Sequence, residues 1–214
     1  LANKVKMGLL EDSLVEELAK RNVHFMRPFG ISKTPEGLRF AYVSGVEASP
    51  LNSSDIVKMT PHDLEYVEEQ YMMSSERDSD EGIIDVLFTW SWPQELSKSF
   101  PAVKVPESSR LGPFLWHLKT RYIFSPSHDS FMHYERVPYE NVDTKTGEFM
   151  HSSRFISLSG ALGIDSDVPT NSKKKWVYAL NLVPGKLLNP ATSSNISRRP
   201  DDCTSNPFLP VCKK

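Results

Sequence analysis

The chain has 214 residues, of which 39% are hydrophobic and 24% are charged, so it can build one sizeable globular core with a tail. A formal net charge of −2 gives no field that would capture a polyanion, so nucleic acid is not expected as the main partner. No stretch approaches the roughly 20 apolar residues needed to span a bilayer, and we expect no membrane span.

Residues 5–20 have the spacing of an amphipathic helix. Leu10, Leu14 and Leu18 recur at i, i+4 and i+8, while acidic residues occupy the other side. Because anionic lipid would repel an acidic polar face, we expect this helix to pack on its own domain rather than on a membrane.

Turn and cap residues mark the next elements. Residues 24–28 and 38–43 predict two short strands, and the Pro and Gly of Thr34–Gly37 favour a tight turn between them, which predicts a hairpin. The sequence Thr-Pro-His-Asp at 60–63 supplies a hydroxyl N-cap, a proline at the first helical position and a carboxylate at the third. It predicts the start of a short inserted helix.

The strongest strand signal lies at residues 84–92, where apolar and polar residues alternate until Pro93 ends the run. Trp90 and Trp92 would share one face of this strand. Aromatic residues in that arrangement usually belong to a core, but the pair could also form a surface for a ligand or partner.

An irregular loop and four further strands follow. Residues 93–113 contain four prolines, and loops of this length are often functional or held by a partner. Strands are expected at 115–124, 131–137, 148–159 and 175–183, with a hairpin turn over Asp143–Gly147. The sequence therefore predicts a single α+β domain over residues 1–183, with a mainly antiparallel sheet, an N-terminal amphipathic helix and one inserted short helix.

Residues 184–214 predict an extended tail. Five prolines and many Ser, Thr and Asn residues argue against a helix or a central strand, and the apolar residues are scattered rather than periodic. We expect such a tail to be ordered by a neighbouring molecule, with Phe208 and Leu209 among the residues that contact the partner.

Cysteines and sequons bear on the compartment. Cys203 and Cys212 could close a disulfide loop, which would need an oxidising environment. Asn52 and Asn195 begin sequons that would suit glycosylation in the same environment. These features favour a secreted or organellar protein, and two free thiols with unused sequons are the alternative.

The densest group of reactive side chains suggests one metal site. His133 and Glu135 would lie on the same face of a strand, and His151 would lie opposite if two strands pair across the 143–147 turn. Two imidazoles and a carboxylate could hold a ferrous ion, as in non-haem oxygenases. Polar residues on a solvent-facing strand explain the same pattern.

One family resemblance concerns about thirty residues in the second half of the chain. Residues 154–163 (RFISLSGALG) and 176–185 (WVYALNLVPG) are similar to the middle of toxin-type ADP-ribosyltransferases. That family implies an arginine on an earlier strand, for which Arg121 or Arg136 would serve, and a later catalytic glutamate. No glutamate follows Ser159, so the transfer reaction would lack its carboxylate.

These observations favour a non-catalytic accessory or structural subunit that docks in a larger protein assembly through its extended loops and C-terminal tail. Its expected partners are other protein subunits, and no cofactor is expected. One alternative is a secreted binding or effector protein with a disulfide-closed tail. The other is an enzyme, either a metal-dependent oxygenase or a divergent ADP-ribosyltransferase-like protein.

Overall fold

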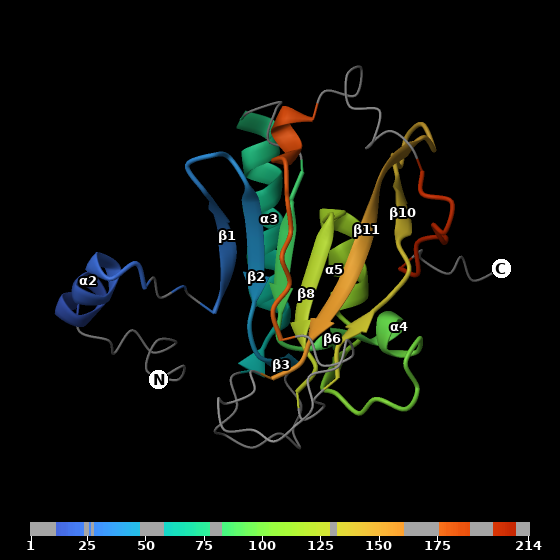
Figure 1. The fold of residues 1–214 in the computed structure, drawn as a ribbon. Helices are drawn as coiled ribbons and strands as arrows, with labels where there is room; N and C mark the ends of the chain where they lie inside the picture. The colour runs from blue at the N-terminus through green and yellow to red at the C-terminus, as the bar shows by residue number, and fades with distance from the viewer. Residues whose placement is uncertain are drawn as a thin grey trace.

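The computed structural model describes residues 12–23, 26, 28–47, 58–77, 83–128, 132–160, 176–188 and 199–208. Its centre is a sheet in the order β1-β2-β5-β8-β11-β10, with β9 also paired to β11 (Figure 1). The strands are β1 (Phe29–Lys33), β2 (Arg39–Val43), β5 (Val86–Thr89), β8 (Tyr122–Pro126), β9 (Tyr134–Glu135), β10 (Tyr139–Val142) and β11 (Phe149–Leu158).

The sheet is mixed. Strands β2, β5, β8 and β11 run parallel to one another at its centre. Strand β1 at one edge, and β9 and β10 at the other, pair in antiparallel fashion with their neighbours. The predicted α+β class is confirmed, and the sheet combines both kinds of pairing.

Helices and short strand pairs complete the fold. The helical elements are α2 (Asp12–Lys20), α3 (Pro61–Arg77), α4 (Gln94–Ser97), α5 (Leu111–Leu118) and a 3₁₀ turn η1 (Gly185–Leu187). Two parallel pairs join β3 (Val46–Glu47) to β4 (Lys58–Met59) and β6 (Trp92–Pro93) to β7 (Glu107–Ser108). Helices α3 and α5 cover one face of the sheet, while α2 stands beyond the β1 edge (Figure 1). Among the described residues, no helix is both long and apolar enough to cross a bilayer.

The hydrophobic core lies between the sheet and helices α3 and α5. Alternating residues of the strands point into it, and they meet the apolar stripes of the two helices. Its buried members include Ala41, Val43, Leu64, Val67, Leu87, Leu111, Phe114, Leu115, Leu118, Ile123 and Phe155. Burying each large side chain of this kind stabilises the fold by about 1.5–3 kcal/mol, so this layer dominates stability.

The predicted start of the inserted helix is confirmed. Helix α3 begins at Pro61, and the Thr60 hydroxyl accepts a hydrogen bond from the Asp63 amide at 3.3 Å. The Asp63 carboxylate in turn accepts one from the Thr60 amide at 2.7 Å. This reciprocal cap satisfies two amides that the helix itself leaves unpaired.

Both predicted hairpins form. Strands β1 and β2 pair from Phe29↔Val43 to Lys33↔Arg39, so the first strand lies five residues later than expected. Strands β10 and β11 pair across the Asp143–Gly147 turn. The Asp143 carboxylate accepts hydrogen bonds from the amides of residues 145 and 146, and Gly147 adopts a left-handed φ of +73°.

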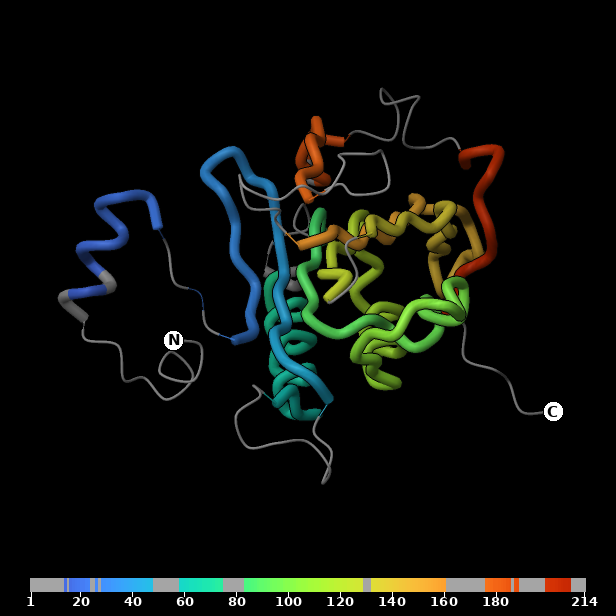
Figure 2. The backbone as a smooth tube through the Cα atoms, turned by 60° about the horizontal axis from the view of Figure 1, so that its bottom comes forward, coloured from blue at the N-terminus to red at the C-terminus, as the bar shows by residue number. Residues whose placement is uncertain are grey.

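The strand expected at 115–124 is wrong in its first half. Residues 111–118 form helix α5, Lys119 ends it in the left-handed conformation, and only Tyr122–Pro126 form a strand. The segment expected as a strand at 175–183 belongs to no β-ladder in its described part, residues 176–183. It crosses the sheet face opposite α3 and α5 (Figure 2).

The described part of the tail, residues 199–208, packs against its own domain. Thr204 forms a parallel bridge with Tyr139 of β10, and the Glu140 amide donates to the Thr204 carbonyl at 2.9 Å. The Phe208 ring is 6% exposed and meets the Tyr139 ring edge-on at 5.5 Å. Because an edge strand has unpaired backbone groups, β10 can order this segment without a neighbouring molecule.

Candidate functional site

The carboxyl ends of the four parallel strands meet at one edge of the sheet. Trp90 follows β5, His128 lies just beyond β8, and Ser159 follows β11. Open sheets with parallel strands commonly bind ligands at this edge, because the loops that leave the strands surround a crevice there. The strand order therefore selects this edge as the first place to look for a site.

A pocket of about 570 Å³ lies at this edge. One wall comes from the residues that follow the strands, and the other from the extended segment at 104–106, which belongs to the proline-rich region. The described lining residues are Trp90, Lys104, Val105, Pro106, Pro126, His128, Leu158, Ser159 and Gly160. A pocket of this volume suits a small organic molecule or the side chains of a docked peptide.

Trp90 and His128 contact each other in the lining of the pocket. Their rings meet edge-on with centroids 5.0 Å apart, and His128 Nε2 lies 2.9 Å from the Trp90 carbonyl oxygen. Since a carbonyl oxygen only accepts, Nε2 carries the hydrogen of this bond. The φ of His128 is +54°, and the Trp90 side chain remains 47% exposed.

The chemistry of the lining favours binding. His128 and Lys104 supply an imidazole and an ammonium group, Trp90 supplies a flat ring, and no carboxylate occurs among the described lining residues. The Ser159 hydroxyl donates weakly to the neighbouring Gly160 carbonyl at 3.4 Å. Within the described part of the chain the pocket thus offers no paired nucleophile and base, whereas its groups could contact an anionic or aromatic ligand.

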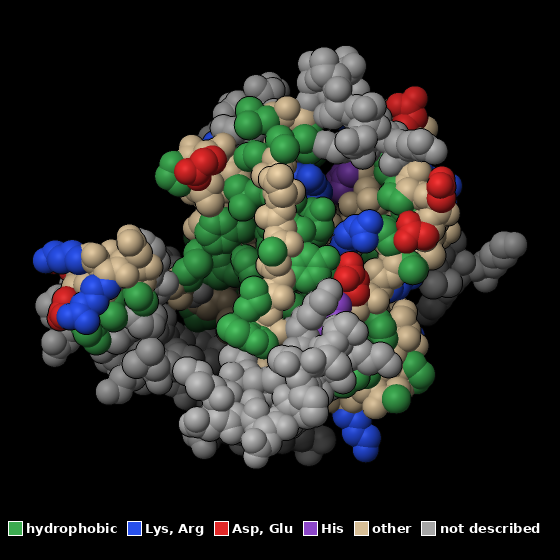
Figure 3. Space-filling view, viewed as in Figure 1, with side chains coloured by type: hydrophobic (Ala, Val, Ile, Leu, Met, Phe, Trp, Pro, Cys, Tyr) green, Lys and Arg blue, Asp and Glu red, His purple; other side chains and the backbone are tan. Residues whose placement is uncertain are grey.

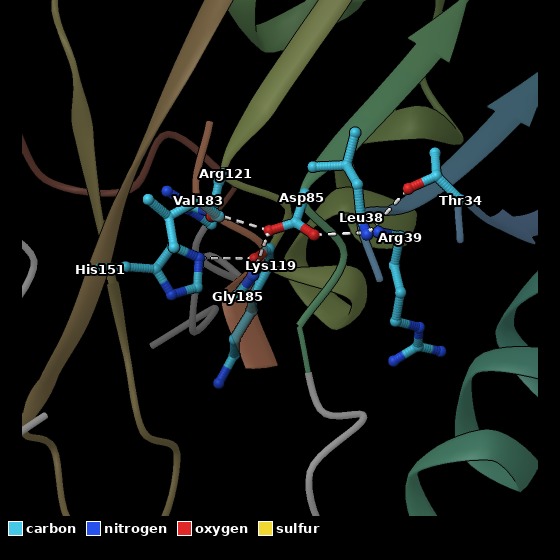
Figure 4. Close-up of polar contacts among 9 residues, drawn as sticks. All are labelled: Thr34, Leu38, Arg39, Asp85, Lys119, Arg121, His151, Val183 and Gly185. Carbon is cyan, nitrogen blue, oxygen red and sulfur yellow. Dashed lines mark hydrogen bonds and ion pairs between the residues drawn. The ribbon is translucent and has the colours of Figure 1, made fainter. Parts of the chain in front are cut away.

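A second polar centre lies at the amino ends of the same strands (Figure 4). Asp85, which precedes β5, is 1% exposed. Its carboxylate accepts hydrogen bonds from the Arg39 amide at 2.9 Å, the Arg121 guanidinium at 2.8 Å and the Gly185 amide at 2.8 Å. Arg121 also donates to the Val183 carbonyl at 2.8 Å. We call Asp85, Arg121 and the backbone of 183–185 the Asp85 clasp, because they attach the crossing segment to the sheet.

His151 lies next to this clasp. It is 4% exposed, and its Nε2 lies 2.6 Å from the Lys119 carbonyl oxygen (Figure 4). Burial is the main reason that the pKa of His151 falls to about 4. At neutral pH the ring is therefore uncharged, with its hydrogen on Nε2, and it serves as a buried structural donor.

The structure does not assemble the predicted metal site. His133 Nε2 and Glu135 Oε2 lie 3.9 Å apart, and Glu135 pairs with Ile156 across the β9–β11 ladder. His151 precedes Ile156 by five residues on β11, a separation of about 16 Å on the opposite face of the strand. Within the described residues, no group of three His, Cys, Asp or Glu side chains could hold a metal ion.

The predicted aromatic surface divides into two environments. Trp90 is half exposed at the pocket, whereas Trp92 is fully buried among Phe100, Tyr134 and Phe155 and donates its indole hydrogen to the Pro126 carbonyl at 2.8 Å. The chain bends after Thr89, where β5 ends, so the alternation expected for a continuous strand does not hold. Trp92 is thus unavailable to a partner.

The remaining candidates lie on the tail and the loops. Phe208 is buried against Tyr139, and Leu209 lies outside the described residues. Cys203 carries a free thiol, and Cys212 is outside the described residues, so the predicted disulfide has no support. Asn52 and Asn195, the two sequon residues, are also outside them.

Sequence reasoning missed the pocket residues Lys104, His128 and Ser159. A usable signal existed, because each strand of a parallel sheet is followed at its carboxyl end by a loop that can carry functional side chains. That signal requires knowing that the strands are parallel, and their partners lie far apart in the sequence.

Comparison with known proteins gives one consistent result. The chain matches no protein-family model. It is 31% identical over 192 residues to CWF19-like protein 1 of Xenopus laevis, which covers 87% of this chain and 32% of that protein. It is 30% identical over 190 residues to a homolog of CWF19-like protein 1 in Caenorhabditis elegans, with the same coverage, and 29% identical over 213 residues to the human protein.

The chain spans about a third of the length of the relatives it matches. These relatives correct one prediction from the sequence. The secreted or organellar location is wrong, because it is contradicted by the similarity to CWF19-like proteins. Of the residues that suggested secretion, Cys203 is a free thiol, and Cys212, Asn52 and Asn195 lie outside the described part of the chain.

Proposed function

We propose that this chain is a non-catalytic accessory component of a nuclear, splicing-related protein assembly. The observation that carries the proposal is the similarity along 87% or more of the chain to CWF19-like protein 1 from frog, nematode and human. The chain would contribute binding surfaces to this assembly, and its partners would be other proteins.

The strand-end pocket supports a binding role. Its described lining combines a half-exposed tryptophan, a histidine, a lysine and three apolar or proline positions from the 104–106 and 126 segments, without a carboxylate. Half-exposed tryptophans beside a concave surface are typical anchors of protein interfaces. We therefore propose that Trp90 and the extended segment 104–106 form one docking surface. We also propose that the exposed side of the tail residues 199–208, which bind along β10, forms a second one.

The proposal is tested by affinity purification of the full-length natural protein from nuclear extract, followed by mass spectrometry. We expect splicing proteins at a fixed ratio, and Trp90→Ala should reduce their recovery several-fold. Met73→Ala is the matched control, because Met73 is 50% exposed at the end of α3 and away from the pocket. Recovery of a single, uncomplexed chain would refute the assembly role, and equal recovery by both variants would refute Trp90 as the docking residue.

A further inference from the structure

The sheet face opposite α3 and α5 carries a continuous series of aromatic side chains. Phe40 contacts Tyr42 and Phe88 at ring distances of 6.4 and 6.5 Å, and Phe88 stacks on Phe124 at 5.9 Å. Phe88 is 48% exposed although it lies on a central strand of the sheet. Figure 3 shows hydrophobic side chains gathered over this face. Central strands of parallel sheets are normally covered on both faces, so this face is only half covered.

A single extended segment, residues 176–183, lies on this face. Its exposure alternates with a period of two: Tyr178, Leu180 and Leu182 are partly buried, whereas the residues between them are exposed. Tyr178 meets the Phe124 ring edge-on at 5.8 Å, so the partly buried positions face the sheet. This is the side-chain pattern of a β-strand in a second layer.

The segment has the side-chain pattern of a strand but not the ladder pairing of one. No residue from 176 to 184 belongs to a β-ladder in the part of the chain that the structure describes. Its far end is fixed by side-chain contacts instead, because Arg121 binds the Val183 carbonyl and Asp85 binds the Gly185 amide. Val177 and Val183, which point outward, are 58% and 50% exposed. A strand fixed in this way presents backbone donors and acceptors along its sides.

We propose that residues 176–183 are one strand of a second β-sheet, whose other strands come from the polypeptide that CWF19-like proteins carry outside the matched third. A strand added beside residues 176–183 would lie over Phe40, Tyr42 and Phe88, at the spacing of about 10 Å found between packed sheets. Its inward side chains would be apolar and its outward ones polar. Main-chain hydrogen bonds would supply the pairing and the aromatic face would supply the buried area.

Two observations favour this polypeptide as the partner of residues 176–183. The matched region is 32% of the length of its frog and nematode relatives, so in those proteins twice as much polypeptide accompanies it. Two arginines described on this face are each paired with a carboxylate, Arg154 with Glu135 at 3.6 Å and Arg121 with Asp85 at 2.8 Å, so they give no net positive charge for a nucleic acid. The inference rests on this face alone and does not depend on the proposed function.

Hydrogen exchange on this chain tests first whether the segment lies outside a β-ladder. The backbone amides of residues 177, 179 and 181 should exchange at least a hundredfold faster than those of β8, which is paired on both sides. Exchange as slow as that of β8 would show that the segment is already part of a sheet, and it would overturn the proposal.

Co-expression then tests whether this polypeptide supplies the other strands. The parts of the Xenopus protein outside the matched region are co-expressed with this chain, and we expect a 1:1 complex in which amides between 177 and 183 become protected. Successive amides of a strand point to opposite sides. Ala179→Pro therefore removes a donor on one side and Leu180→Pro on the other, and the proline on the protected side should weaken binding at least tenfold.

The matched controls are Ala179→Ser and Leu180→Ala, which keep the amide and should bind within about threefold of the unchanged chain. The absence of a complex would overturn the proposal, as would a complex with unprotected amides at 177–183. Two other outcomes would also overturn it. One is a dimer of this chain that protects the same amides, and the other is protection of these amides on adding single-stranded RNA.

Discussion

The two ends of the parallel strands use polar side chains in opposite ways. At the amino ends, Asp85 is 1% exposed and its carboxylate accepts three hydrogen bonds, from Arg39 of β2, from Arg121 just before β8 and from the crossing segment. At the carboxyl ends, His128 and Lys104 face a pocket of about 570 Å³ beside a half-exposed tryptophan. Both groups lie on the same sheet, yet Asp85 is buried with its donors, whereas the tryptophan at the pocket stays half exposed to solvent.

This difference indicates that the amino ends of the strands contribute to stability and the carboxyl ends to binding. A buried carboxylate with paired donors fixes the geometry of the strands it joins, and removing it leaves those donors unpaired. Groups at a pocket mouth keep contact with water, so removing them changes the fold little. Substitutions at the amino end should therefore act on the free energy of unfolding, and those at the carboxyl end on binding.

Asp85→Ala should have the largest effect on stability. It removes the acceptor of Arg121, whose side chain is 11% exposed, and of two backbone amides. Breaking a buried pair of this kind costs about 3–5 kcal/mol in the free energy of unfolding. Urea unfolding followed by circular dichroism measures it, and hydrogen exchange at Gly185 should rise at the same time.

Glu135→Ala is the matched control for Asp85→Ala. Glu135 also pairs with an arginine, Arg154 at 3.6 Å, but the two side chains are 29% and 38% exposed. Such a pair contributes at most about 1 kcal/mol. Equal losses of stability for the two variants would contradict the assignment of Asp85 as the main polar connection of the fold.

His151 should make the amino end sensitive to acid. Burial lowers the pKa of His151 from 6.5 to about 4, so between these values the unfolded chain binds a proton that the folded chain does not. Stability attributable to this group is present above pH 6.5 and declines as the pH falls toward 4. The shift corresponds to a loss of about 3 kcal/mol across that range.

The measurement is the free energy of unfolding from pH 7 to pH 4 for the unchanged chain and for His151→Gln. The glutamine can donate to the Lys119 carbonyl but does not titrate in this range. The free energy of unfolding of the variant should therefore fall by about 3 kcal/mol less between pH 7 and pH 4 than that of the unchanged chain. Parallel profiles for the two proteins would show that His151 does not control the acid sensitivity.

Local signals in the sequence predicted several elements correctly. The Thr60 cap and the start of α3, the hairpin turn at Asp143–Gly147 and the strand around residues 86–89 all depend on neighbouring residues. Helix α5 was misread because Leu111, Phe114, Leu115 and Leu118 form a helical stripe inside a short apolar run, and such runs are ambiguous between helix and strand.

Pairing between distant strands could not be predicted in the same way. Strand β5 lies between β2 and β8, which are 46 and 36 residues away at the Arg39–Asp85 and Asp85–Arg121 contacts. Neither local propensity nor alternation specifies such partners. The pocket and the Asp85 clasp exist only after these strands align. The predicted metal site failed for the same reason, because His133 and Glu135 lie 3.9 Å apart whereas His151 lies elsewhere on β11.

Trp90→Ala should have the smallest effect on stability and completes the comparison between the two ends. The substitution removes an edge-to-face contact with His128 and a side chain that is 47% exposed, and the ring contact is worth about 0.5–1.5 kcal/mol. We expect the free energy of unfolding to fall by no more than about 1.5 kcal/mol, while partner recovery falls several-fold. Urea unfolding of this variant beside Asp85→Ala decides the point. A loss above about 2 kcal/mol would make Trp90 part of the structural core, and the carboxyl end would then be a second stabilising centre rather than a binding edge.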